Sequence, residues 1–138
     1  MKEGNLTTKS FIDVGCGVPL IPDFIKDLGC KDVHGLEYNP RIVNMVKSHY
    51  PDVALHEDNM LTYQEYGKYD ILYTYNPLRD PEDMEKALLI IMNQMKPGAV
   101  LYFMKACDCD LFLKNHGFVC QNGRYGIYKF VKPEKDGV

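Results

Sequence analysis

The chain has 138 residues, of which 46% are apolar and 25% charged, and its formal net charge is -3. Because this is the size and composition of one ordinary globular domain, we expect a single domain over residues 1–138, with a short lead at 1–9 and a tail at 133–138. The sequence has no apolar run long enough to span a membrane, no secretory signal and no Lys/Arg cluster, so we expect a cytoplasmic protein and find no indication of nucleic-acid binding.

Short apolar runs alternate along the chain with segments whose apolar residues recur at helical spacing. The apolar runs predict strands at 11–14, 33–37, 53–56, 69–75 and 99–104. The helical spacing predicts helices at 20–28, 40–50, 81–95 and 110–116. Asn39 and Asp80 are suited to cap the second and third helices, since each precedes a proline that favours the first helical position.

The C-terminal part of the chain has a different pattern. Two short runs, at 118–121 and 124–131, flank the dipeptide Asn122-Gly123, which is typical of a tight hairpin turn. The whole pattern predicts an α/β fold: a doubly wound, mostly parallel twisted sheet of about seven strands, with helices on both faces and a C-terminal antiparallel hairpin.

The five cysteines and four histidines do not predict a metal site. The cysteines are odd in number and lack a C-x-x-C spacing, so neither a disulfide framework nor a zinc site is indicated (Cys16, Cys30, Cys107, Cys109 and Cys120). Cys107 and Cys109 could bind a metal only with a distant partner. The histidines are dispersed and are expected to be structural or exposed (His34, His49, His56 and His116).

The loop after the first strand is the first candidate site. It lies where an open parallel sheet binds its ligand, at the carboxyl end of a strand and before a helix. Gly15 and Gly17 allow the backbone to approach a ligand, but a dinucleotide fingerprint would need a third glycine at Leu20. Two glycines alone therefore do not identify a cofactor.

The segment Phe11-Ile12-Asp13-Val14-Gly15-Cys16-Gly17 resembles the first motif of class I S-adenosylmethionine-dependent methyltransferases. That motif has apolar residues, an acid, an apolar residue and then G-x-G-x-G, and here Pro19 replaces the last glycine. The resemblance extends roughly from Ser10 to Lys132. It implies S-adenosylmethionine as cofactor, S-adenosylhomocysteine as product, and a cofactor site that includes Asp13, Gly15, Cys16 and Gly17.

The resemblance implies further cofactor-binding residues after the second and third strands. Glu37 stands where the family has an acid that binds the ribose hydroxyls, and Tyr38 could pack on the adenine or the ribose. After the third strand, Asp58 corresponds to an acid that faces the adenine amino group. Asn59 and Met60 adjoin it, and Met60 could either cover the adenine or belong to the core.

The end of the fourth strand is the candidate for catalysis. Tyr75, Asn76 and Pro77 occupy the position where many members of the family hold the group to be methylated. Amino-group methyltransferases have an acid or Asn, then Pro-Pro and an aromatic residue, and Leu78 and Arg79 depart from that pattern. We interpret the partial match as a site for a nitrogen acceptor. The alternative is that Asn76 and Pro77 only turn the chain into the next helix.

The sequence thus predicts methyl transfer to an acceptor that it does not identify, on a protein, an RNA or a small molecule. The alternative is a catalytically degenerate methyltransferase fold that binds cofactor or a partner. A nicotinamide oxidoreductase would need a substrate domain, and a flavodoxin-like or receiver-like domain would lack the closing hairpin. Because so few residues surround the core, we expect either a large acceptor or a homo-oligomer or partner subunit that completes the pocket.

Overall fold

The computed structural model describes residues 5–17, 19–104, 109–122 and 126–134. Its strands follow the predicted order (β1 Ser10–Val14, β2 Asp32–Glu37, β3 Ala54–Glu57, β4 Ile71–Tyr75, β5 Val100–Met104, β6 Val119–Asn122 and β7 Ile127–Val131). Its helices alternate with them (η1 Leu6–Thr8, α1 Leu20–Asp27, α2 Pro40–His49, η2 Tyr66–Lys68, α3 Pro81–Gln94 and α4 Asp110–Asn115). The predicted elements are all present, with bounds that differ by a few residues.

The strands form one seven-stranded sheet in the order β3-β2-β1-β4-β5-β7-β6. The first five strands are parallel to one another, and β7 is antiparallel to both β5 and β6. The predicted mostly parallel sheet with a C-terminal antiparallel hairpin is therefore confirmed. The turn residue Gly123 lies outside the described residues, as do Arg124 and Cys107.

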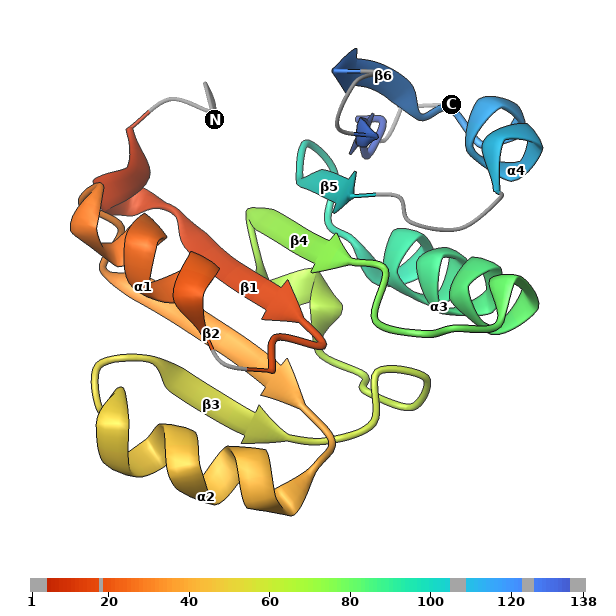
Figure 1. The fold of residues 1–138 in the computed structure, drawn as a ribbon. Coiled ribbons are helices and arrows are strands. Elements are labelled where there is room, and N and C mark those ends of the chain that lie inside the picture. Colours follow the sequence, from red (N-terminus) through yellow and green to blue (C-terminus); the bar gives the residue numbers. More distant parts are fainter. Residues whose placement is uncertain (1–4, 18, 105–108, 123–125, 135–138) are drawn as a thin grey trace.

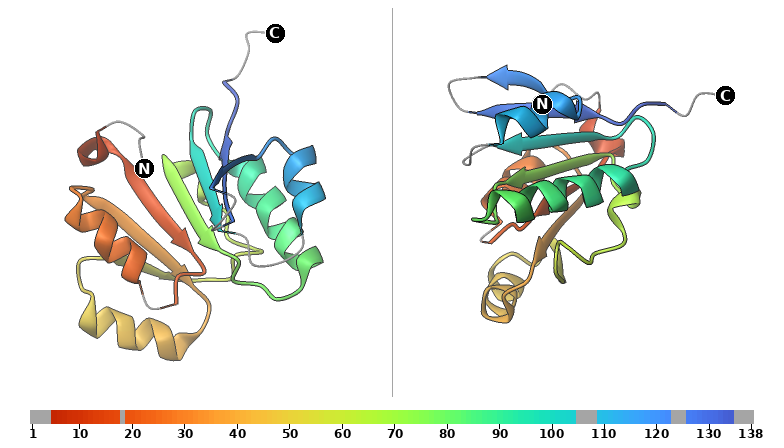
Figure 2. Two further views of the ribbon diagram at one scale, coloured as in Figure 1. Left: turned by 45° about the horizontal axis from the view of Figure 1, so that its top comes forward. Right: turned by 90° about the vertical axis from the view of Figure 1, so that its right-hand side faces the viewer.

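Helices lie on both faces of the sheet, as Figures 1 and 2 show. Helices α1 and α2 lie on one face, over the half of the sheet that contains β1, β2 and β3. Helices α3 and α4 lie on the other face, where α3 buries Met84, Leu88 and Ile91 against the core. The two pairs of helices thus cover different halves of the sheet.

Two of the helices begin as the sequence predicts. The Asn39 side chain accepts a hydrogen bond from the Arg41 backbone N–H at 2.9 Å and caps α2. The Asp80 carboxylate accepts one from the Glu82 N–H at 2.8 Å and caps α3. Each cap satisfies a backbone donor that has no partner within the helix.

Helix α1 has an unexpected environment. Its apolar residues recur at the predicted helical spacing, but among its leucine, isoleucine and phenylalanine side chains only Ile25 is buried. Leu20, Phe24 and Leu28 are more than half exposed. The spacing therefore predicted the helix correctly and did not tell what covers its apolar side.

Candidate functional site

The loop between β1 and α1 is held against the end of β2. The Gly15 and Cys16 N–H groups both donate to the Leu36 carbonyl, at 2.8 and 2.9 Å. Gly15 has a φ of +73°, and a Cβ atom on it would lie 2.6 Å from the Pro77 Cβ. Only glycine fits here, because its backbone conformation disfavours a side chain and the ring of Pro77 packs directly against it.

Glu37, at the end of β2, connects this loop to the start of α2. One of its carboxylate oxygens accepts a hydrogen bond from the Gly17 N–H at 2.9 Å, and the other accepts one from the Asn39 N–H at 2.8 Å. Each oxygen of an ionised carboxylate has a second acceptor site. Glu37 is thus held in one orientation and retains the capacity to accept hydrogen bonds from two hydroxyl groups of a ligand.

The loop after β3 forms the opposite wall. Asp58 accepts a hydrogen bond from the Asn59 N–H at 2.7 Å, and the Asn59 side chain accepts one from the Leu61 N–H at 2.9 Å. The Tyr66 hydroxyl, which is fully buried, donates to the Met60 carbonyl at 2.7 Å. These bonds fix the backbone that presents Met60 and Leu61.

These three segments and the chain after β4 enclose a cavity of about 450 Å³. Eight of the nine predicted cofactor-binding residues line it (Gly15, Cys16, Gly17, Glu37, Tyr38, Asp58, Asn59 and Met60). The remaining lining residues are apolar (Leu36, Leu61, Pro77 and Leu78). The three leucines were not predicted as site residues, although each adjoins a residue that was.

Asp13 lines a second cavity, of about 330 Å³, that shares Gly15 and Cys16 with the first. Its side chain is buried, and no hydrogen bond or ion pair joins its carboxyl to any of the described residues. Burial, with a smaller contribution from the Glu37 carboxylate, raises the pKa of Asp13 to about 8. A buried acid without a partner is suited to receive a hydrogen-bond donor or cation from a ligand.

Cys16, like Gly15, lines both cavities. Burial, reinforced by the negative charges of Asp13 and Glu37, raises the pKa of its thiol to about 12. The thiol is therefore protonated at neutral pH and is unsuited to act as a nucleophile.

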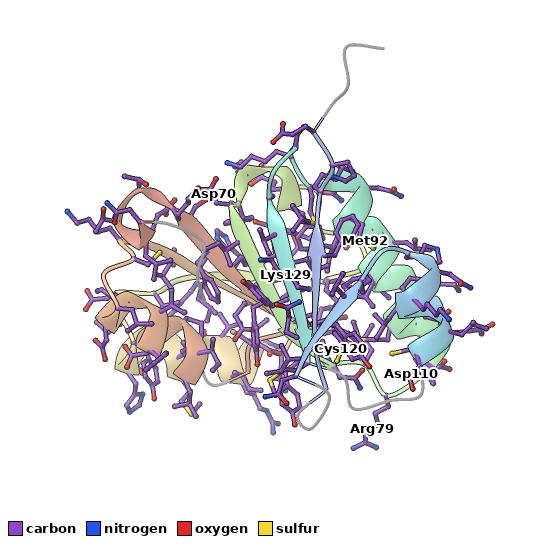
Figure 3. The ribbon with its side chains drawn as sticks, turned by 90° about the horizontal axis from the view of Figure 1, so that it is seen from above. Asp70, Arg79, Met92, Asp110, Cys120 and Lys129 are labelled. Atoms are coloured by element: carbon purple, nitrogen blue, oxygen red, sulfur yellow. The ribbon has the colours of Figure 1, made fainter. Side chains whose placement is uncertain are left out.

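The predicted catalytic segment is divided between the two cavities. Pro77 lines the first and Tyr75 the second, while Asn76, which stands between them in the chain, lines neither of these two cavities and has a φ of +34°. Asn76 is the only described residue other than glycine with a positive φ, and such outliers cluster at functional sites. Arg79 is exposed and points away from the body of the protein (Figure 3).

Two of the four histidines, His34 and His56, are far apart in the sequence but adjacent in the structure. The His34 Nδ1 and His56 Nε2 atoms are 2.9 Å apart, and the Asp32 carboxylate lies 2.6 Å from the other nitrogen of His34. Their proximity depends on the pairing of β2 with β3, which the sequence does not specify. No group of three or more potential metal ligands occurs in the part of the chain that the structure describes.

The site as a whole can bind an elongated ligand with chemically distinct parts. Glu37 can accept hydrogen bonds from vicinal hydroxyls, while Leu36, Met60 and Leu61 provide apolar surface for a flat group. Asp13, in the adjoining cavity, can accept a cationic or donor group.

Within the described residues, no helix is long and apolar enough to cross a membrane.

The family model described as methyltransferase domain matches residues 12–103. No curated protein sequence matches the chain. Among solved structures, the amino pentose methyltransferase CalS10 from Micromonospora echinaspora is 24% identical, with a TM-score of 0.62 over 72% of this chain and 44% of that chain. This chain thus spans less than half of that enzyme.

Two shorter proteins match over nearly the whole chain. An RNA methyltransferase from Salinibacter ruber, bound to S-adenosylhomocysteine, is 18% identical with a TM-score of 0.70, over 94% of this chain and 84% of that chain. The N-methyltransferase NodS from Bradyrhizobium japonicum, bound to the same compound, is 14% identical with a TM-score of 0.71, over 96% and 85%. At these identities the likeness concerns the fold.

Proposed function

The chain belongs to the methyltransferase domain family, and we propose that it transfers a methyl group from S-adenosylmethionine to an acceptor. The observation that carries this proposal is the pair of cavities that share Gly15 and Cys16. One has Glu37 and Asp58 on its walls, and the other has the carboxyl of Asp13, which has no hydrogen-bond or ion-pair partner among the described residues. These residues lie at the carboxyl ends of parallel strands, where open α/β sheets bind their ligands.

The larger cavity suits the adenosine part of the cofactor. Glu37 would accept hydrogen bonds from the two ribose hydroxyls, and Asp58 would accept one from the adenine amino group. Met60, Leu61 and Leu36 would enclose the adenine ring between apolar surfaces. Two S-adenosylhomocysteine complexes with this fold support the choice of ligand.

The smaller cavity suits the methionine part. The ammonium group of the cofactor would provide the partner that the Asp13 carboxyl lacks among the described residues. A cation at this position favours the ionised carboxylate, so binding would lower the pKa of Asp13 below its ligand-free value of about 8. Cofactor binding at neutral pH is therefore expected to release a proton.

The cofactor supplies an activated methyl group, so the protein has mainly to align the acceptor and exclude water. Methyl transfer would join the acceptor lone pair to the methyl carbon as the carbon–sulfur bond breaks. The bonding pair would stay on the sulfur of S-adenosylhomocysteine, and the acceptor proton would pass to solvent. Asn76 and the backbone around Pro77 would hold the acceptor for this in-line attack. We further propose that the acceptor atom is a nitrogen and that a partner subunit or a second copy of the chain closes the site.

Label transfer from methyl-tritiated S-adenosylmethionine to a panel of amines, carboxylated small molecules and total RNA tests this activity. For an acceptor found in this way, we expect Asn76→Ala to lower kcat by about tenfold or more, while the Kd for S-adenosylhomocysteine stays within about twofold. Cofactor binding without transfer to any member of the panel would favour the alternative of a catalytically degenerate methyltransferase fold, to which the departures at Leu78 and Arg79 already point.

The cytoplasmic location stays a prediction.

A further inference from the structure

Gly35 lies in the middle of β2, between two residues that carry side chains. Strand β2 lies between β1 and β3 (Figure 1), and Gly35 pairs with Asp13 of β1 on one side and with Leu55 of β3 on the other. Paired residues of neighbouring strands direct their side chains to the same face of the sheet. The absence of a side chain at Gly35 therefore leaves a gap in this row, beside Asp13.

The backbone conformation does not explain why this residue is glycine. Gly15 and Gly17, in the loop after β1, have φ values of +73° and +56°, whereas Gly35 has no positive φ and belongs to a regular strand. A glycine inside a strand weakens it, and it commonly marks a place where another part of the chain approaches closely. The reason for glycine here is therefore space.

The thiol of Cys16 occupies this space. A Cβ atom on Gly35 would lie 2.9 Å from the Cys16 Sγ, well inside the distance of about 3.5–4.0 Å at which non-bonded heavy atoms attract. Leu55 limits the gap on the other side, since its Cδ1 would lie 3.1 Å from the same Cβ. The thiol also donates to the Gly17 carbonyl, at 3.3 Å. It can keep this position only while residue 35 has no side chain.

The thiol continues a series of contacts that hold the loop along β2. The Gly15 and Cys16 N–H groups donate to the Leu36 carbonyl, and the Gly17 N–H donates to the Glu37 carboxylate. Cys16 lines both cavities of the proposed cofactor site. A thiol displaced from β2 would therefore either turn into these cavities or lift the loop, and both changes would weaken cofactor binding.

We propose that Gly35 is a positioning residue of the cofactor site, which keeps open the space for the Cys16 thiol and so fixes the loop between β1 and α1. The inference rests on the proposed function, since it concerns the same site. Gly35 itself is not among the residues that line either cavity, so its effect on the cofactor passes through Cys16.

Calorimetric titration of the full chain with S-adenosylhomocysteine, with Gly35→Ala in two backgrounds, tests this coupling. In the wild-type background we expect Gly35→Ala to raise the Kd about tenfold or more. In the Cys16→Ala background, which lacks the Sγ atom, we expect the same substitution to change the Kd by less than about twofold, because residues in contact are not additive. An equal loss in both backgrounds would overturn the inference, since it would mean that Gly35 only stabilises β2.

Leu55→Val is the matched control for the other side of the gap. It shortens the second side chain that a Cβ on Gly35 would meet, without touching the loop. We expect Gly35→Ala to raise the Kd about tenfold in this background too. Recovery of affinity with Leu55→Val but not with Cys16→Ala would overturn the inference. If Gly35→Ala alone does not fold, the double variant with Cys16→Ala decides, because it must fold and bind S-adenosylhomocysteine.

Alkylation of Cys16 by iodoacetamide, followed by mass spectrometry of its peptide, separates this inference from the proposed function. We expect Gly35→Ala to accelerate the reaction several-fold, because the displaced thiol leaves its place against β2. An unchanged rate would overturn the inference. Absence of S-adenosylhomocysteine binding in every protein would instead overturn the proposed function, while the alkylation rates would still test the contact between Gly35 and Cys16.

Discussion

Asp13 illustrates what single residues contribute to this site. Its place before the glycine loop can be read from the sequence, as can the positions of Glu37 and Asp58 at strand ends. The sequence does not reveal that Asp13 faces a separate cavity with Tyr73 and Tyr75, because that depends on how β1 pairs with β4. The pairing of His34 with His56 was missed for the same reason.

The raised pKa of Asp13 predicts a specific pH dependence of stability. Its carboxyl titrates near 8 in the folded chain and near 3.8 when unfolded, so the folded state binds the extra proton between these values. The contribution of this carboxyl to the free energy of unfolding is therefore greatest below pH 4 and falls as the pH rises towards 8. Asp13→Asn removes this term, and we expect the variant to gain on the order of 4 kcal/mol over the wild type between pH 4 and pH 7.

Urea unfolding of both proteins across this pH range measures the difference. Because Asn has nearly the shape of Asp and cannot ionise, the two curves should diverge steadily with increasing pH. Parallel curves for wild type and Asp13→Asn would contradict the account of this carboxyl.

Among the elements, the short helix η2 has the role that was hardest to foresee. The sequence predicts a strand at 69–75, and β4 begins two residues later, at Ile71. The preceding residues Tyr66–Lys68 form a 3₁₀ turn that the sequence does not predict. The turn is tied to α3, since the Gln94 side chain accepts from the Tyr66 N–H at 3.1 Å and donates to the Tyr63 carbonyl at 2.9 Å. Helix α3 thus holds Tyr63 and Tyr66 in place, and Tyr66 in turn holds Met60, which lines the first cavity.

Tyr66→Phe tests whether this support acts on ligand binding. The variant loses the hydrogen bond to the Met60 carbonyl, which leaves a buried acceptor unsatisfied at a cost of about 1–3 kcal/mol in stability. We expect the Kd for S-adenosylhomocysteine to rise several-fold at a temperature where the variant is fully folded. Tyr69→Phe, which loses the hydrogen bond between the Tyr63 and Tyr69 hydroxyls, is the control.

Calorimetric titration of the two variants distinguishes positioning from general stability. If both raise the Kd equally, or neither does, Tyr66 only stabilises the fold. No separate rescue of the Kd is needed, because the Tyr69→Phe variant serves as the control within the same experiment.

The cap of α3 is expected to affect stability without affecting the site. Asp80→Ala removes the hydrogen bond to the Glu82 N–H and should lower the free energy of unfolding by about 1 kcal/mol. Denaturant unfolding measures this loss, and S-adenosylhomocysteine binding should be unchanged. A large change in affinity would mean that the start of α3, which follows Pro77 and Leu78, moves with the site.

For the whole molecule, the alternation of strands and helices was sufficient to predict the fold. Apolar runs and capping residues such as Asn39 and Asp80 depend on local sequence, and the closing hairpin excluded competing α/β folds. The exposure of the apolar residues of α1 could not be predicted, because apolar spacing from Leu20 to Leu28 shows that a helix has an apolar side and does not show whether anything covers it. The domain extent over residues 1–138 stays a prediction.

A calorimetric titration of the chain with S-adenosylhomocysteine, alongside Glu37→Ala and the control Glu57→Ala, tests the proposed cofactor site. Glu57 ends β3 as Glu37 ends β2, but it does not line the cavity of about 450 Å³ that Glu37 lines. We expect a Kd on the order of 1–100 µM, raised about tenfold or more by Glu37→Ala because two charge-assisted hydrogen bonds are lost, and unchanged by Glu57→Ala. Absence of binding, or equal effects of the two variants, would contradict a cofactor site at this cavity.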